Sequence, residues 1–94
     1  MSDQRLQQLG ARWTIANGEL RLSLKGPMSR TGEVAAHAGK LADEMDHHPT
    51  ITLEYAGLEL SIYSHDAKAI TERDWRYAEA LEPWLRANGW NLPA

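Results

Sequence analysis

Two segments of the chain alternate apolar and polar residues on both sides of a glycine-containing turn. The first runs from Trp13 to Leu24 around Asn17-Gly18, a dipeptide that favours a type I′ turn. The second runs from Ile51 to Ile62, and we expect its turn at Ala56-Gly57. A period of two places the apolar side chains of each hairpin on one face. The pattern therefore predicts two β-hairpins, each with one face in a core and one in water.

Two-residue turns also fix which residues lie opposite each other in the two hairpins. Each predicted pair joins two apolar residues, so the register agrees with the burial pattern. We expect the following pairs: Trp13–Leu22, Ile15–Leu20, Ile51–Ile62, Leu53–Leu60 and Tyr55–Leu58.

The segment between the hairpins carries apolar residues at three- and four-residue steps, as one buried helix face requires. We expect a helix over residues 32–46, with Ser29 or Thr31 as its cap. It should end near Asp46 or His47, because the proline that follows disfavours helical backbone in the residue before it. The predicted buried stripe is Val34, Ala35, Ala38, Leu41, Ala42 and Met45.

A final helix is predicted to begin at Thr71, whose spacing to Asp74 fits a capping box with aspartate in the glutamate position. We expect a break or kink near Glu82, because Pro83 lacks a backbone donor and crowds the preceding turn. Four apolar residues should be buried: Trp75, Ala78, Leu81 and Leu85.

The order strand-strand-helix-strand-strand-helix (ββαββα) predicts a two-layer α+β fold. A four-stranded antiparallel sheet forms one layer, and the two helices pack on one of its faces. We also expect a short helix over residues 2–9, with Ser2 as its N-cap and Gly10 as its stop. A chain of 94 residues supports one small core, so residues 1–94 should form a single domain.

Composition narrows the classes of function. Ten basic and 13 acidic residues give a net charge of −3, which argues against a broad surface for direct nucleic-acid binding. The chain has no cysteine, which excludes disulfides and thiolate zinc sites. No apolar run approaches the roughly 20 residues that span a bilayer, and Met1-Ser2-Asp3-Gln4 lacks the features of a signal peptide. We therefore expect a cytoplasmic protein without membrane contact.

Three of the four histidines fall in two clusters, Asp46-His47-His48-Pro49 and Ser64-His65-Asp66, and Asp74 follows the second. Imidazole gains and loses a proton near neutral pH, so this constellation indicates proton-transfer chemistry. In an antiparallel hairpin, the residues after its second strand lie beside those before its first. We therefore expect His65 to lie near His48 in one cleft.

Each of these residues also has a purely structural interpretation. A histidine pair at a helix C-terminus interacts favourably with the helix dipole, Asp74 fits as a helix cap, and His65 fits as a strand-end residue. Three imidazoles with Asp66 or Asp74 also match the ligand chemistry of zinc. The convergence of two histidine clusters favours a functional site over these interpretations. His37, outside the clusters, is expected to be a solvated surface residue.

The same residues resemble the pattern of the pterin-4a-carbinolamine dehydratases, which in animals are also described as dimerisation cofactors of a homeodomain transcription factor. The pattern is an acidic or polar residue, three spacers, His-His-Pro, an aromatic residue, a histidine and an aspartate. In this sequence it reads Asp43, His47-His48-Pro49, Tyr55, His65 and Asp74. The resemblance extends over about residues 13–85, and the fixed gaps make it far more specific than a His-His pair.

The resemblance implies dehydration of 4a-hydroxytetrahydropterin to quinonoid dihydropterin, the recycling step after aromatic amino-acid hydroxylation. An acid must protonate the departing hydroxyl and a base must take a ring-nitrogen proton, and imidazole serves either role. The resemblance also implies that no metal or organic cofactor is needed. The expected partners are a small-molecule pterin and further copies of the chain in a dimer or tetramer.

We assign His47 and His65 as the proton-transfer pair, with His48 binding the pterin or sharing the acid–base role. The two motif carboxylates would orient imidazoles or accept hydrogen bonds from the pterin ring. The predicted substrate-binding or orienting residues are Asp43, Pro49, Tyr55, Ser64 and Asp74.

The sequence departs from the family pattern at the expected rim of the pocket. Thr50-Ile51 stands where members commonly carry an aromatic residue, and Lys68-Ala69-Ile70 replaces a common Gly-Gly-Leu segment. The chain also has no phenylalanine, whereas family members usually bury one on the middle helix, so we expect the core to be packed differently. The alternative function is a catalytically idle relative that acts as an assembly or interaction partner. Trp84, Trp90 and Leu92-Pro93 would be its candidate contacts.

Overall fold

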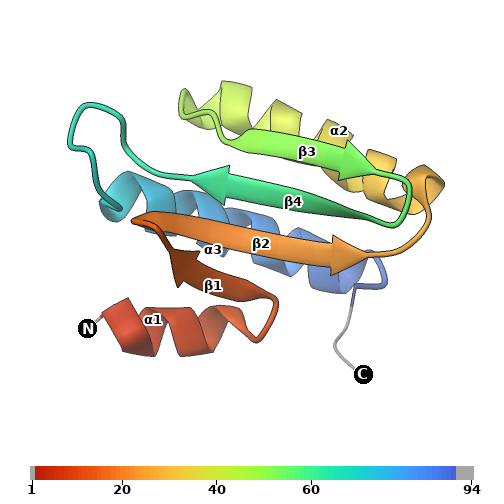
Figure 1. Ribbon diagram of the computed structural model, residues 1–94, viewed down its shortest axis with the longest axis horizontal. Coiled ribbons are helices and arrows are strands. Elements are labelled where there is room, and N and C mark those ends of the chain that lie inside the picture. Colours follow the sequence, from red (N-terminus) through yellow and green to blue (C-terminus); the bar gives the residue numbers. More distant parts are fainter. Residues whose placement is uncertain (1, 91–94) are drawn as a thin grey trace.

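The computed structural model describes residues 2–90 (Figure 1). Its four strands form an antiparallel sheet in the order β1-β2-β4-β3, and α2 and α3 cover one face of it (Figure 1). Helix α1 contacts β1 and α3. The predicted α+β class and ββαββα order are confirmed. The elements are α1 (Ser2–Leu9), β1 (Trp13–Ala16), β2 (Glu19–Lys25), α2 (Met28–Met45), β3 (Thr50–Glu54), β4 (Gly57–Ile62) and α3 (Glu72–Ala87).

The first hairpin has the predicted turn and register. Asn17 and Gly18 both have positive φ, +55° and +74°, as a type I′ turn requires. Trp13 lies opposite Leu22, and both side chains are buried under the helices. The pairing of β2 with β4 then joins the two hairpins into one sheet.

The second hairpin differs from the prediction at its turn. The loop is Tyr55-Ala56 and not Ala56-Gly57, because Glu54 pairs with Gly57. The predicted register is therefore wrong by two residues. A displacement of two leaves the side chains within the strands on their predicted faces, whereas a displacement of one would have inverted the faces. Tyr55 is the exception, because it lies in the turn and is exposed. The apolar pairs observed are Ile51–Leu60 and Leu53–Leu58.

Gly57 belongs to strand β4, where it lets two backbones come close together. A Cβ added at Gly57 would lie 2.5 Å from the carbonyl oxygen of Leu24 in β2. Its φ is not positive, so close approach and not turn geometry requires this glycine. The glycine of Ala56-Gly57 therefore resembles a turn residue in the sequence, although it belongs to a strand.

Helix α2 begins at Met28 and not at residue 32, so its predicted start is wrong. Pro27 is the N-cap, and the backbone N–H groups of Arg30 and Thr31 donate to its carbonyl oxygen. Ser29 and Thr31 consequently lie in the first turn and do not cap it. The predicted apolar stripe is confirmed, since its residues are buried or packed against the core.

Helix α3 has the predicted capping box, in which Thr71 and Asp74 each bond the backbone of the other. The helix is not broken at Pro83 and continues to Ala87. The predicted buried residues are confirmed: Trp75, Ala78, Leu81 and Leu85. Packing of the two leucines on either side of the proline holds the helix together despite the missing backbone bond.

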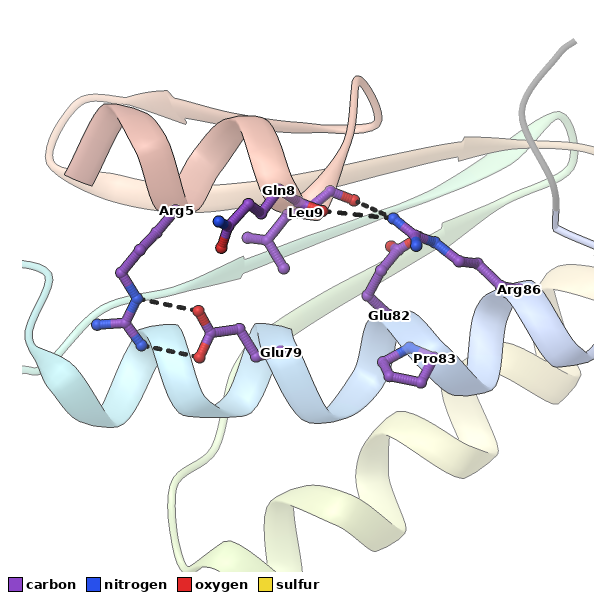
Figure 2. Close-up of a pocket in the computed structure, with 7 residues that line it drawn as sticks. All are labelled: Arg5, Gln8, Leu9, Glu79, Glu82, Pro83 and Arg86. Carbon is purple, nitrogen blue, oxygen red and sulfur yellow. Dashed lines mark hydrogen bonds and ion pairs between the residues drawn. The ribbon is translucent and has the colours of Figure 1, made fainter. Parts of the chain in front are cut away.

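Helix α1, which confirms the expected helix at residues 2–9, is held against α3 by charged side chains. They line a cavity of about 460 Å³ between the two helices (Figure 2). Arg5 donates to both carboxylate oxygens of Glu79, at 2.8 and 2.9 Å. Arg86 donates to the carboxylate of Glu82 at 2.8 Å and to carbonyl oxygens at the end of α1. These groups pair with one another and serve to anchor α1.

The two C-terminal tryptophans pack within the chain. His37, which was expected to be a solvated surface residue, is half-buried and stacks on Trp84 with 4.2 Å between ring centroids. Trp90 is buried, and the guanidinium of Arg30 lies 4.4 Å from its ring centroid. Both tryptophans, which an interaction role was expected to use, therefore make contacts within the chain. Leu92-Pro93 lies outside the described residues.

Candidate active site

The histidine pair follows the C-terminus of α2, where the chain leaves the helix through a Schellman motif. Asp46 adopts the left-handed conformation, with φ +53° and ψ +44°. The N–H of Asp46 donates to the carbonyl of Asp43 and the N–H of His47 to that of Ala42. Pro49 then keeps the following backbone extended. The helix therefore ends where predicted and presents two adjacent imidazoles on different sides of the chain.

His47 turns inward and contacts a buried carboxylate. Its Nε2 lies 2.5 Å from Oδ1 of Asp74, and the side chains are 11% and 0% exposed, respectively. The other oxygen of Asp74 accepts hydrogen bonds from the Thr71 N–H at 2.7 Å and the Ser64 hydroxyl at 2.9 Å. One carboxylate thus caps α3 and fixes the orientation of the His47 ring. Asp74 is therefore a helix cap, as its structural interpretation predicts, and it also contacts an imidazole of the histidine cluster.

Ser64 supports this arrangement from the end of the second hairpin. Its side chain is fully buried, and its hydroxyl lies 2.6 Å from that of Thr71 as well as bonding Asp74. A backbone bridge to Ala69 fixes its position. Because Ser64 is buried, its hydroxyl can orient Asp74 but cannot contact a ligand directly.

His48 turns outward and pairs with a different carboxylate. Its Nε2 lies 3.0 Å from Oδ1 of Asp43, and both side chains are largely exposed. The motif carboxylates were expected to orient imidazoles, and Asp43 contacts His48 and not His47. The structure gives each imidazole of the pair its own carboxylate.

His65 reaches the same region from the loop between β4 and α3. Its ring lies against that of Tyr63, with centroids 4.4 Å apart. The loop turns back sharply through Lys68, which has φ +53° and donates its N–H to the His65 carbonyl. A non-glycine residue such as Lys68 adopts this left-handed conformation at some cost in strain.

All three clustered histidines line one surface cavity of about 400 Å³. The volume falls in the range of small-molecule sites. The loops that carry these residues lie at the same end of the sheet (Figure 1). The lining residues are Asp46, His47, His48, His65, Asp66 and Arg73. His65 is thus brought to the cavity that His47 and His48 line, although the register used to predict this was wrong by two residues.

Other predicted site residues lie elsewhere. Tyr55 is 87% exposed in the β3–β4 turn, at the opposite end of the sheet from the histidines (Figure 1). Thr50 lines a different hollow, together with polar residues of β2 and β4, and Ile51 packs against the core. The Thr50-Ile51 departure therefore does not alter the wall of the histidine cavity. Pro49 acts through the backbone and does not line the cavity.

Sequence reasoning missed Arg73 as a member of the site. Arg73 lines the cavity and donates to Oδ1 of Asp66 at 2.5 Å. The hydrogen bond from Arg73 lowers the pKa of Asp66 below its ordinary value. Its position next to Asp74 was the available signal, because residues at the start of α3 border the same loop.

Among residues 2–90, no three His, Asp or Glu side chains are grouped so that they could hold a metal ion. Over the same residues, no helix combines the length and apolar character needed to cross a membrane.

The fold has a counterpart among solved structures. The crystal structure of a transcriptional coactivator/pterin dehydratase from Brucella melitensis aligns with a TM-score of 0.77, over 87% of this chain and 89% of that chain. The two sequences are 22% identical, so this likeness establishes the fold alone, a small α+β domain.

The sequence comparison identifies the family. The profile described as Pterin 4 alpha carbinolamine dehydratase matches residues 1–84, and the chain belongs to this family, as its histidine motif predicted. A Mycolicibacterium smegmatis protein named "Putative pterin-4-alpha-carbinolamine dehydratase" is 34% identical over 70 residues, 73% of this chain and 74% of that protein. A Haloarcula marismortui protein of the same name is 34% identical over 76 residues, 79% and 82% of the two chains.

Proposed function

We propose that this protein dehydrates 4a-hydroxytetrahydropterin to quinonoid dihydropterin and so recycles pterin after aromatic hydroxylation. One observation carries the proposal: three imidazoles line a single cavity, and one of them is fixed by a buried carboxylate. Family membership supplies the substrate class.

The reaction is an elimination of water that needs two proton transfers. The bond between C4a and its hydroxyl breaks, the hydroxyl leaves as water after receiving a proton, and a ring nitrogen loses a proton. We assign these transfers to His47 and His65, which reach the cavity from different elements. Imidazoles on two sides of one ligand can serve as acid and base in the same turnover.

The carboxylates support the histidines in different ways. Asp74 holds the His47 ring by Nε2, which leaves Nδ1 for exchange with the substrate. It also stabilises the positive charge that the ring carries after taking up a proton. His48, paired with the exposed Asp43, is assigned to pterin binding. The chemistry of this elimination requires neither a metal nor an organic cofactor.

Spectrophotometric turnover of 4a-hydroxytetrahydropterin tests the proposal. His47→Ala and His65→Ala should each lower kcat/KM by roughly 10²-fold or more, since each removes one proton-transfer group. His37→Ala is the matched control, because His37 stacks on Trp84 away from the cavity. It should stay within about twofold of the wild type. A double variant, His48→Ala with His65→Ala, gives the decisive comparison. If the wild type turns over the substrate no faster than this variant, the proposed enzymatic function is wrong.

We also propose that the chain forms a homo-oligomer. Several large apolar side chains remain exposed on the single chain, including Met28, Leu53 and Tyr55. A small domain gains stability when such groups are covered by another copy. Light scattering coupled to size exclusion would give the mass in solution, and a mass of one chain across a hundredfold range of concentration would contradict this expectation.

A further inference from the structure

Arg73 lines the histidine cavity, yet the acid–base pair gives it no role. It is the second residue of α3 and directly precedes Asp74. The two neighbours point differently: Asp74 is buried against His47, whereas the Arg73 side chain is 53% exposed at the cavity. Its guanidinium donates a hydrogen bond to Asp66, which lines the same cavity.

Stability gives little reason for an arginine at this position. A cation in the first turn lies near the positive end of the helix dipole, where negative charge is favoured. The ion pair with Asp66 is exposed on both sides, and such pairs add little to the free energy of unfolding. The placement of Arg73 is therefore better explained by what enters the cavity.

The charges of the cavity select the chemistry of that ligand. The lining includes two carboxylates, of Asp46 and Asp66, and one guanidinium, of Arg73, so an anion would meet more negative than positive charge. A neutral ring with both a carbonyl and N–H groups suits this lining. A guanidinium has five N–H donors in a planar fork, and Asp66 occupies part of that fork.

We propose that Arg73, held in place by Asp66, donates a hydrogen bond to the ring carbonyl of the pterin and so orients the ring between His47 and His65. This inference rests on the proposed function. The pterin carbonyl carbon is bonded directly to C4a, the carbon that carries the departing hydroxyl. A donor that holds this carbonyl therefore fixes where the hydroxyl lies relative to the imidazoles.

The test compares Arg73→Gln and Arg73→Lys with wild-type protein, using turnover of 4a-hydroxytetrahydropterin and equilibrium binding of 7,8-dihydropterin. Arg76→Gln is the control. Arg76 lies on the same helix and also pairs with a carboxylate, that of Glu72, but it does not line the cavity. Circular dichroism and Tm establish that each variant folds. Arg73 is exposed, so these should change little.

We expect Arg73→Gln to raise both KM and Kd about tenfold or more with kcat within about threefold, because a charged hydrogen bond is lost. Arg73→Lys should be intermediate, since it keeps the charge without the fork. Arg76→Gln should match the wild type. If the wild type turns over and binds while Arg73→Gln keeps KM and Kd within twofold, this inference alone is overturned. A wild type that neither turns over nor binds pterin overturns both it and the proposed function.

Discussion

Asp74 bonds His47 through one carboxylate oxygen and the backbone N–H of Thr71, the start of its own helix, through the other. The buried carboxylate therefore belongs to both the candidate active site and the framework of the fold. A change at this residue should affect both activity and stability.

Asp74→Asn should lower both kcat/KM and stability. The amide has one acceptor oxygen and cannot accept from Thr71, Ser64 and His47 together, so a buried group loses its partner. We expect a loss of about 1–3 kcal/mol in the free energy of unfolding and at least about tenfold in kcat/KM. Urea unfolding and turnover measure the two effects. Asp43→Asn, at an exposed position, should leave stability within about 0.5 kcal/mol; equal losses for both variants would contradict this account.

Ser64→Ala should weaken the support behind Asp74 without changing the lining of the cavity. Loss of the buried hydroxyl leaves one acceptor of Asp74 short of a donor. We expect about 1–2 kcal/mol of destabilisation, measured by urea unfolding. Ser23→Ala is the control, because its hydroxyl makes a long bond to Glu59 at an exposed site. The assignment fails if the two serine variants are equally stable.

Glu82→Ala should be among the most destabilising single changes at the α1–α3 junction. Its carboxylate, 4% exposed, accepts from Trp13 Nε1 and from Arg86 and pairs with the buried Arg12. Removal leaves a buried cation unpaired, at a cost of about 3–5 kcal/mol.

Glu79→Ala provides the comparison for Glu82→Ala, because both residues line the same cavity (Figure 2). Glu79 pairs with Arg5 at a partly exposed site, so its loss should cost about 1 kcal/mol or less. Thermal or urea unfolding of both variants checks the ranking, and a larger loss for Glu79→Ala would refute it.

Asp46→Gly should stabilise the protein. Asp46 holds a left-handed conformation that glycine adopts without strain, and it places a negative charge at the negative end of the α2 dipole. We expect a gain of about 0.5–1 kcal/mol, seen as a higher Tm. Asp46→Ala removes the charge but not the strain and should gain less. An Asp46→Gly variant less stable than the alanine variant would show that the conformation is not the cause.

The ion pair between Arg5 and Glu72 should make stability depend on pH. The hydrogen bond from Arg5 lowers the pKa of Glu72 below its ordinary value, so the folded state favours the charged carboxylate. This contribution is present above the ordinary pKa and is lost as the pH falls through the depressed one. Glu72→Gln should therefore be slightly less stable than the wild type at pH 7 and equal to it in strong acid. At pH 7 the difference should also shrink in about 1 M salt, and a difference that grows on acidification would contradict the sign.

The fold was predictable because alternation and helical periodicity each identify a buried face. The register of the second hairpin was not predictable. Gly57 is needed because β2 and β4 come close together at this position, and only their pairing reveals this. The start of α2 was missed for a related reason. Pro27 caps it by conformation alone, while the hydroxyl of Thr31 bonds back to the Pro27 carbonyl from inside the helix.

The candidate site was predictable in its histidines and in the two carboxylates that contact them, Asp43 and Asp74, but not in the rest of the cavity lining. His47 and His48 come just after the end of α2, and His65 comes just after the end of β4. These two ends meet at one edge of the fold, so the three histidines line the same cavity. Tyr55 was placed in the cleft by the motif alone, and the chain carries it to the far turn. The only sequence signal for Arg73 is its place beside Asp74, because a cavity-lining arginine and a solvated arginine on a helix have the same sequence pattern.

The left-handed residue that ends α2 also limits how this segment can vary in length. The backbone turns about 100° per residue in a helix, so one residue inserted before Asp46 would rotate the exit and swing His47 away from Asp74. An insertion in the Tyr55-Ala56 turn would leave both untouched. A change in the length of the interval from Asp43 to Pro49 should therefore remove the contact between His47 and Asp74, whereas substitutions outside the histidine pair should keep it.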